Sequence, residues 1–157
     1  MAEFTNNPVQ VVQPNQQVLL NTTIGCPKGY VIHREGSGIV TLRGITTNCF
    51  ARYQVTFNGN IAIPNGGAVS PISVAIAIDG EPVLTSKAIF TPAAAADATD
   101  TDNNYGNVTS TAIVTVPKGC CFNVSVENTS VVPATPAGSN APAINVKNAN
   151  LTVSRIA

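Results

Sequence analysis

PISVAIAIDGEPVLTSKAIFTP, residues 71–92, is the stretch that decides the fold. Its Asp-Gly dipeptide at positions 79–80 favours the tight turn of a β-hairpin, so the stretch is predicted to form two strands joined there. Side chains alternate between the two faces of a strand, and here both faces are apolar. The residues concerned are Val74, Ala75, Ile76, Ala77 and Ile78. In an antiparallel fold such a strand is covered twice, once by its own core and once by another layer.

The second layer has two possible sources. A loop of the same chain could cover a central strand, or a second copy of the chain could pack against it. We expect a subunit interface at residues 74–78, because no polar side chain on this strand favours contact with water.

The segments on the N-terminal side of this stretch also predict strands. Residues 30–35 and 39–44 flank the turn sequence GSG and predict a hairpin. Residues 51–64, ARYQVTFNGNIAIP, predict a long strand that buries one of its faces. The core residues expected on that face are Tyr53, Val55 and Phe57.

The C-terminal half repeats the pattern. Residues 108–119 and 120–130 predict a second pair of strands, and residues 144–157 predict two short strands that close the chain. No segment repeats apolar residues at helical spacing over three turns. The sequence therefore predicts an all-β protein without significant helix, with an N-terminal extended arm over residues 1–15 and one domain over residues 16–157.

Composition narrows the classes of function. The eight Lys and Arg residues balance eight Asp and Glu residues, which argues against nucleic acid and anionic membranes as partners. Only 10% of the 157 residues are charged, against about 25% in ordinary globular proteins. Such a surface suits a protein packed against copies of itself. The N-terminal residues resemble no secretory signal and no apolar run is long enough to span a bilayer, so we expect the chain to reach a virion or extracellular surface through lysis or through release of a spore rather than by export.

Four cysteines, Cys26, Cys49, Cys120 and Cys121, are candidates for chemistry, metal binding or cross-linking. No pair has the C-x₂-C spacing of a zinc site, and the only histidine, His33, lies within a predicted strand. Adjacent cysteines are about 3.8 Å apart at Cα, too close for an unstrained disulfide.

Two states of the cysteines fit the sequence. In one, Cys26 or Cys49 pairs with one of the adjacent two cysteines. In the other, all four are free thiols that pack as small apolar residues. The alternation that points Phe122 into the core would also point Cys120 inward and Cys121 outward.

DATDTDNNYG, residues 97–106, is the one candidate metal loop. Asp100, Asp102 and Asn104 alternate as calcium ligands do, but Tyr105 stands where the turn glycine of such loops is required. We therefore expect a solvated acidic loop without metal. Signatures of serine hydrolases, nucleotide binding and dinucleotide binding are absent, so we expect neither an enzyme nor a cofactor.

The order of the strands resembles the C1q/TNF-like jelly rolls, most closely the small bacterial and phage domains related to the C-terminal domain of exosporium collagen-like glycoproteins. The resemblance covers nearly the whole chain. The stretches that carry it are GSGIVTLRG (36–44), ARYQVTFNGNIAIP (51–64), VAIAIDGEPV (74–83), VPKGCCFNVSVENTS (116–130) and NANLTVSRIA (148–157). The resemblance implies a two-sheet antiparallel jelly-roll sandwich that assembles as a homotrimer. The chain has no Gly-X-Y repeat and therefore no collagen stalk.

These observations predict a non-enzymatic structural protein on the exterior of a virion, such as a phage capsid decoration or fibre protein. The N-terminal arm would tether it to a host lattice through apolar anchors. These anchors are Phe4, Val9, Val11 and Val12. One alternative is a spore-surface or appendage subunit cross-linked by disulfides. Another is a carbohydrate-binding module that contacts glycans through Tyr105.

Overall fold

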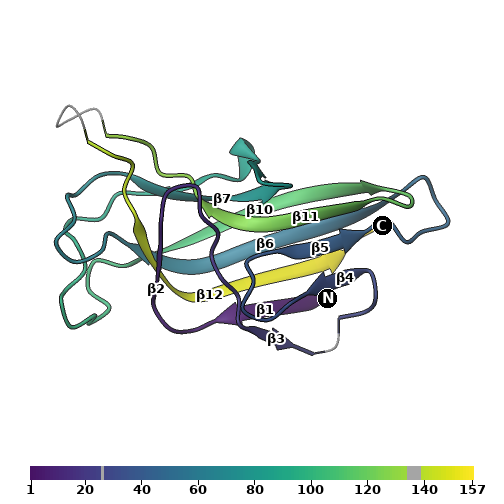
Figure 1. The fold of residues 1–157 in the computed structure, drawn as a ribbon, viewed down its shortest axis with the longest axis horizontal. Coiled ribbons are helices and arrows are strands. Elements are labelled where there is room, and N and C mark those ends of the chain that lie inside the picture. Colours follow the sequence, from purple (N-terminus) through teal and green to yellow (C-terminus); the bar gives the residue numbers. More distant parts are fainter. Residues whose placement is uncertain (26, 134–138) are drawn as a thin grey trace.

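Two antiparallel sheets packed face to face form the protein in a computed structural model that describes residues 1–25, 27–133 and 139–157 (Figure 1). Sheet A has the order β10-β6-β12-β1-β3, with β2 also paired to β12. Its strands are β1 (Ala2–Asn6), β2 (Gln10–Val12), β3 (Thr22–Ile24), β6 (Phe50–Ala62), β10 (Gly106–Pro117) and β12 (Ile144–Arg155).

Sheet B has the order β4-β5-β11-β7-β8, with β9 also paired to β7. Its strands are β4 (Val31–His33), β5 (Val40–Arg43), β7 (Ile72–Ile78), β8 (Glu81–Pro82), β9 (Ala88–Phe90) and β11 (Cys121–Asn128). In the described part of the chain, one 3₁₀ turn, η1 (Leu84–Ser86), is the only helical element, and no helix there could cross a membrane. The prediction of an all-β jelly-roll sandwich is confirmed.

The hydrophobic core lies between the sheets, where the predicted alternation is confirmed. Tyr53, Val55 and Phe57 on β6 are completely buried. The Tyr53 hydroxyl donates a 2.6 Å hydrogen bond to the carbonyl oxygen of Arg43, so it links the two sheets. Burial raises the pKa of this phenol above its ordinary value.

Residues 71–92 form the predicted hairpin, but its second arm is interrupted between β8 and β9. Asp79 and Gly80 have φ values of 50° and 83°, the positive angles that a two-residue hairpin turn requires. Pro82 has no N–H to extend the ladder. Beyond it the chain makes the turn η1, where the Ser86 hydroxyl oxygen accepts a 3.0 Å hydrogen bond from Ile76 N. A side chain thus replaces part of the backbone ladder before β9 resumes it.

Strand β7 is covered on both faces by its own chain, which corrects the expected subunit interface. Val74, Ala75, Ile76 and Ala77 have no exposed surface, and only Ile78 is partly exposed. A side chain that is already fully buried has no exposed surface left to bury in a contact with a second copy. The other possibility named above, cover by segments of the same chain, is therefore the correct one. Opposite Ala75 lies Glu127 on β11, which is itself buried, and desolvation raises the pKa of its carboxyl group.

The N-terminal segment belongs to sheet A, which corrects the expected free arm over residues 1–15. β1 pairs with both β12 and β3, and β2 pairs with β12. Phe4 is 0% exposed and Val12 is also buried, so neither side chain is available as an anchor to another surface. Val9 and Val11 are 38% and 57% exposed. Backbone pairing and burial of Phe4 therefore make this segment part of the domain.

The final segment forms one long strand rather than two short ones. β12 pairs with β6 along its length, and its register shifts between Lys147 and Asn150. Asn148 has a φ of 53° at this irregularity, and such a bulge bends a strand without ending it. The strand therefore crosses most of sheet A, and its N-terminal part brings Lys147 to the end of the sandwich where the acidic loop lies.

Candidate functional site

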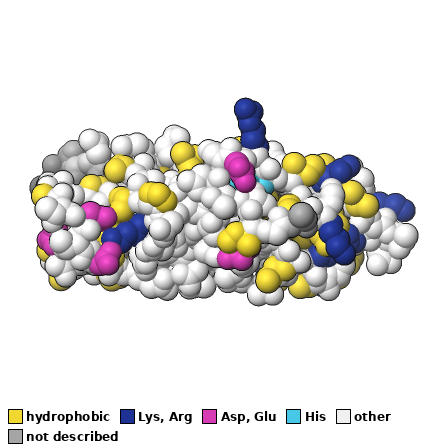
Figure 2. Space-filling view, turned by 90° about the horizontal axis from the view of Figure 1, so that it is seen from below, with side chains coloured by type: hydrophobic (Ala, Val, Ile, Leu, Met, Phe, Trp, Pro, Cys, Tyr) yellow, Lys and Arg dark blue, Asp and Glu magenta, His cyan; other side chains and the backbone are white. Residues whose placement is uncertain are grey.

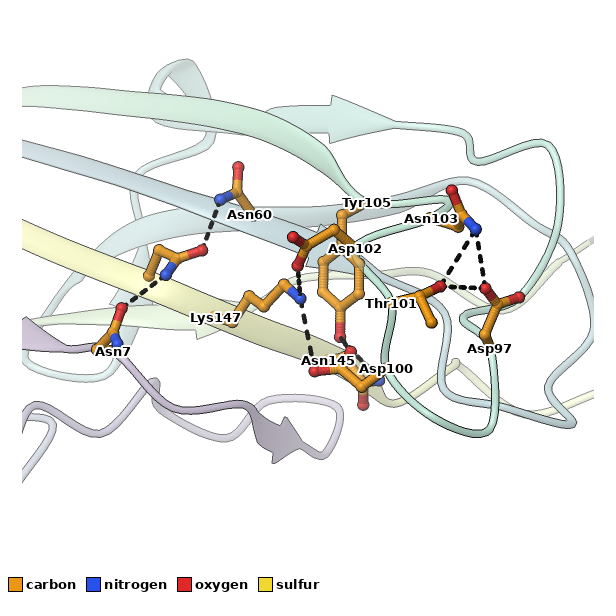
Figure 3. A network of polar contacts seen from close by, with 11 residues as sticks. Asn7, Asn60, Asp97, Asp100, Thr101, Asp102, Asn103, Tyr105, Asn145 and Lys147 are labelled. Atoms are coloured by element: carbon orange, nitrogen blue, oxygen red, sulfur yellow. Dashed lines mark hydrogen bonds and ion pairs between the residues drawn. The ribbon is translucent and has the colours of Figure 1, made fainter.

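The acidic loop of residues 97–105 is tied to sheet A by a network of polar contacts (Figure 3). The Lys147 ammonium donates to carboxylate oxygens of Asp100, at 3.5 Å, and of Asp102. At the loop's outer end, Asn103 donates a 3.0 Å hydrogen bond to the Asp97 carboxylate, and the Thr101 hydroxyl also donates to it. Hydrogen bonding from Thr101 and then Asn103 lowers the pKa of Asp97 below its ordinary value.

Tyr105 is enclosed by this network. The Lys147 ammonium lies 4.2 Å from the centre of its ring, a cation–π distance. The Tyr105 hydroxyl donates a 2.8 Å hydrogen bond to Asp100 and accepts one of 3.3 Å from Asn145. Burial, followed by the hydrogen bond to Asp100, raises the pKa of this phenol. One ring face and the hydroxyl group are therefore engaged inside the protein, which weighs against Tyr105 as a platform for stacking a sugar.

The same contacts bear on the candidate calcium ligands. Asp100, Asp102 and Asn104 all have positive φ, so the loop is tightly curved around them. The cation that neutralises the carboxylates of Asp100 and Asp102 is the Lys147 ammonium. The Asn104 side-chain amide donates a hydrogen bond to the carbonyl oxygen of Ala95. Within residues 1–25, 27–133 and 139–157, no group of three His, Cys, Asp or Glu side chains is placed to hold a metal ion.

Replacing Lys147 by Met is expected to loosen the acidic loop while leaving the sandwich folded. Met keeps the apolar stem but removes the ammonium, so Asp100 and Asp102 repel each other without compensation. Amide hydrogen exchange at Asn104 and Tyr105 should become several-fold faster, and exchange in β6 should not change. The hydrogen bond to Asp102 raises the pKa of Lys147, so its contribution is present below the ordinary lysine pKa and is lost as pH rises through the raised value.

A matched control for this variant is Lys118→Met, which removes an exposed ammonium from the turn between β10 and β11. It should leave exchange in the acidic loop unchanged. Unaltered protection of Tyr105 in Lys147→Met would show that the ammonium does not hold the loop.

The outward face of sheet A is a second candidate surface, and it is almost uncharged. Its side chains are linked to one another across the strands: the Asn107 amide donates to Asn58, at 2.8 Å, and the Thr111 hydroxyl to Thr56, at 3.3 Å. The outward residues on β1, β6, β10 and the end of β12 are Glu3, Thr5, Arg52, Gln54, Thr56, Asn58, Asn60, Asn107, Thr109, Thr111, Ile113, Thr115, Asn150, Thr152 and Ser154. Lateral hydrogen bonds order these side chains before any partner binds.

The described cysteines match the expected free-thiol state in being unpaired, but they do not pack as small apolar residues. Cys49, Cys120 and Cys121 are free thiols and all three are exposed, while Cys26 lies outside the described residues. Cys120 belongs to the turn before β11 rather than to the strand, so the alternation does not extend to it and it does not point inward. The predicted disulfide between Cys49 and one of the adjacent pair is not present.

His33 is engaged inside the sandwich rather than available for catalysis. Its Nδ1 lies 3.3 Å from the Thr23 hydroxyl and its Nε2 lies 3.0 Å from the carbonyl oxygen of Ser37. Its ring packs 4.7 Å from the ring of Phe4, which belongs to the opposite sheet. With both nitrogens occupied, the imidazole has no free position for a substrate.

A cavity of about 500 Å³ lies beside residues 63–70, 133, 139–140 and 142–143. The described residues that line it are apolar, small or amide side chains, such as Ile63, Val69 and Asn140. None of the described lining residues is titratable.

Sequence reasoning missed Lys147 and the sheet A face. Nothing local in the sequence INVKNAN links position 147 to position 100, because their contact depends on the way β12 and the loop meet in space. The sheet A face did have a signal, since Asn107, Thr109, Thr111 and Thr115 alternate with core residues along β10.

With two antiparallel sheets and a hydrophobic core between them, the chain belongs to the class of jelly-roll domains. Its fold is that of the C1q globular domain. The globular domain of zebrafish complement 1qA aligns with a TM-score of 0.50 and 14% identity over 96% of this chain and 94% of that chain.

Two more distant structures align less well. The C-terminal domain of EclA, described as a sugar-binding protein, has a TM-score of 0.41 and 17% identity over 95% of this chain and 79% of its own. The CBM22-1 xylan-binding domain of Xyn10C from Paenibacillus barcinonensis has a TM-score of 0.34 and 11% identity over 99% of this chain and 87% of its own. Scores below 0.5 do not establish a common fold. No family model and no curated protein matches the sequence.

Proposed function

We propose that the chain is a non-enzymatic structural domain that assembles as a homotrimer through the outward face of sheet A and is displayed on the exterior of a virion, as a decoration or fibre protein. The observation that carries the proposal is the broad, nearly uncharged face described above, on which only Glu3 and Arg52 bear a charge. A non-enzymatic role agrees with the engaged imidazole of His33 and the cavity without titratable lining.

The size of this face suits a subunit contact. β6 has 13 residues, and a strand rises about 3.3 Å per residue, so the face is roughly 40 Å long. Four strands about 4.8 Å apart make it roughly 15–20 Å wide. The resulting area is close to the roughly 800 Å² that each partner contributes to a standard interface. Few charges would have to be desolvated, which favours permanent association.

Replacing Ile113 by Arg is expected to dissociate the trimer. Ile113 is 53% exposed halfway along β10, the strand at one edge of the face, and the substitution would place a cation in each subunit contact. Sedimentation equilibrium should give three times the 16.1 kDa chain mass for the wild type and the single chain mass for the variant. The matched control is Ile89→Arg on β9 of sheet B, where Ile89 is 65% exposed. That control should remain trimeric.

The trimer is contradicted if the wild type sediments as a single chain at micromolar concentration. Equal dissociation by both Arg substitutions would also contradict assembly through sheet A. Display on a virion has a separate test: a purified virion should contain the chain in many copies, detected by mass spectrometry of intact particles.

One alternative is favoured by a specific observation. Three exposed thiols, Cys49, Cys120 and Cys121, are placed where they could link copies of a spore-surface or appendage layer in an oxidising environment. Boiling the native assembly in detergent with and without reductant separates the two functions. A ladder of covalent oligomers that only reductant removes favours this alternative, and complete alkylation of all thiols without reductant excludes it.

A further inference from the structure

One end of the sandwich is strongly basic. We call this end the basic pole and define it by Lys28, Arg43, Arg52, Lys118 and Arg155. Figure 2 shows several Lys and Arg side chains at one end of the long axis, while acidic side chains lie at the other end, with a basic side chain beside them, and near the middle. Segments 27–31, 43–53, 116–122 and 153–157, which build the basic pole, contain no Asp or Glu.

The fold brings these segments together. Arg43 Nη1 donates a 3.0 Å hydrogen bond to the carbonyl oxygen of Gly29, which joins the end of β5 to the loop before β4. The backbone N–H of Lys118 donates a 2.9 Å hydrogen bond to the carbonyl oxygen of Cys49, which joins the β10–β11 turn to the loop before β6. In an antiparallel sheet the end of one strand lies beside the start of its neighbour. Five cations that are distant in sequence are therefore brought to the same end of the sandwich.

The basic pole has the composition of a binding surface rather than of a solvated edge. The Arg52 guanidinium lies 4.9 Å from the ring centre of Phe50, and that of Arg155 lies 5.2 Å from the ring centre of Tyr30. Ile45 and Ile156 are about half exposed beside them. Arginine and aromatic residues are enriched in protein interfaces relative to the rest of the surface.

The opposite end is the acidic pole, formed by Asp97, Asp100 and Asp102 in the acidic loop (Figures 1 and 3). The side chain of Lys147, which neutralises part of this charge, is only 9% exposed, whereas that of Asp102 is 85% exposed. The cation therefore lies beneath the carboxylates, and the surface that a partner meets is negative.

We infer that copies of this chain associate head to tail, with the basic pole of one copy on the acidic pole of the next. The net charge is zero, so no overall repulsion keeps copies apart. Contact between two basic poles would oppose five cations to five, and contact between two acidic poles would oppose carboxylates. Only the head-to-tail orientation pairs opposite charges. Such a contact joins two different surfaces, so it produces linear chains rather than closed dimers.

The contact uses the ends of the sandwich rather than its side, and it shares only Arg52 with the sheet A face. The two kinds of assembly also differ in their response to salt. Exposed charges are screened beyond about 8 Å at physiological ionic strength and beyond about 3 Å at 1 M. Head-to-tail growth should therefore be lost in high salt, while a trimer held by an uncharged face should keep its mass.

The test is static light scattering over a concentration series, at about 20 mM and about 500 mM salt. For the wild type, the mean mass should rise with concentration at low salt and fall in high salt to a constant value. A basic-pole variant, Lys28→Glu with Lys118→Glu, should show no such rise, because both side chains are exposed at the pole. The matched control is Arg34→Glu with Lys87→Glu, which changes net charge equally away from the poles and should behave as the wild type.

An acidic-pole variant completes the design. Ala94→Lys, Ala98→Lys and Thr99→Lys add cations at exposed positions without removing any side chain of the loop's network. Alone, this variant should not associate, because both of its poles are basic. Mixed with the basic-pole variant, it should form one-to-one pairs at low salt, because each variant keeps one unaltered pole. A constant wild-type mass at all concentrations, or no association in the mixture, would overturn the inference. Polyphosphate binding that requires Lys28 and Lys118, in a protein whose mixture does not associate, would assign the pole to a polyanion instead.

Discussion

Removal of residues 1–12 is expected to unfold the domain, not merely to detach it from a host lattice. The deletion removes β1 and β2, which leaves the edges of β12 and β3 without backbone partners. It also removes Phe4, which is completely buried and packs against His33 across the sandwich. An extended arm would have tolerated the same deletion.

A single substitution isolates the packing part of this effect. Phe4→Ala should lower the free energy of unfolding by about 3–5 kcal/mol, the usual cost of removing a buried phenyl ring. For a domain of this size, that corresponds to a fall in Tm of about 10 °C or more. Circular dichroism during heating measures this fall.

The matched control for Phe4→Ala is the double variant Val9→Ala, Val11→Ala. It also shortens apolar side chains in the N-terminal segment, but both are substantially exposed, so Tm should change little. If Phe4→Ala has the Tm of the wild type, Phe4 is not a core residue and the arm has to be reconsidered.

Replacement of Gly44 by Ala is expected to have the second largest effect. Gly44 is buried at the end of β5, where a Cβ atom would overlap the carbonyl oxygen of Pro117. Backbone cannot rotate away as a flexible side chain can, so either the β10–β11 turn or the loop after Gly44 has to move. We expect a loss of about 2–4 kcal/mol, typical of overpacking that forces a backbone shift.

Two backbone hydrogen bonds report this movement. The backbone N–H of Gly44 donates a 2.8 Å hydrogen bond to the carbonyl oxygen of Cys120, and that of Gly119 donates a 3.0 Å hydrogen bond to the carbonyl oxygen of Gly44. Amide exchange at positions 44 and 119 should therefore accelerate in Gly44→Ala, together with the fall in Tm. Gly29→Ala is the control, because its Cβ meets no atom within 4 Å and Gly29 lies at the same end of the sandwich. Similar Tm values for the two variants would contradict the predicted clash.

The two variants also separate stability from assembly. Phe4 lies inside the sandwich, so its loss should weaken folding without changing which surfaces associate. Gly44 lies among the segments of the basic pole, so its replacement should disturb Lys118 and weaken head-to-tail contact even in molecules that remain folded.

The strands and most core faces could be predicted from the sequence. Tyr53, Val55 and Phe57 alternate with polar residues, and alternation along one strand is a local property that needs no knowledge of the partner strand. The turn at Asp79-Gly80 was equally predictable, because a positive φ at both positions is a property of those residues. The same rule failed at Cys120, since the local pattern does not state where a turn ends and a strand begins.

The candidate site could be predicted only in part. The acidic loop was evident from its composition, and Tyr105 was recognised as unusual within it. Its partner Lys147 lies more than forty residues further along the chain, so no spacing rule connects the two. For the same reason, the sequence did not reveal that a protein side chain would supply the cation that Asp100 and Asp102 require.

The sequence by itself determined an all-β protein, its turns and its low charge, because these depend on residue type and on neighbours close in the chain. Only the tertiary structure decided that β7 is covered by its own chain, that β1 completes sheet A and that opposite charges gather at the two poles. The physical reason is that burial, strand pairing and charge proximity arise between segments far apart in sequence. Local alternation states which side chains avoid water, but not which distant segment covers them.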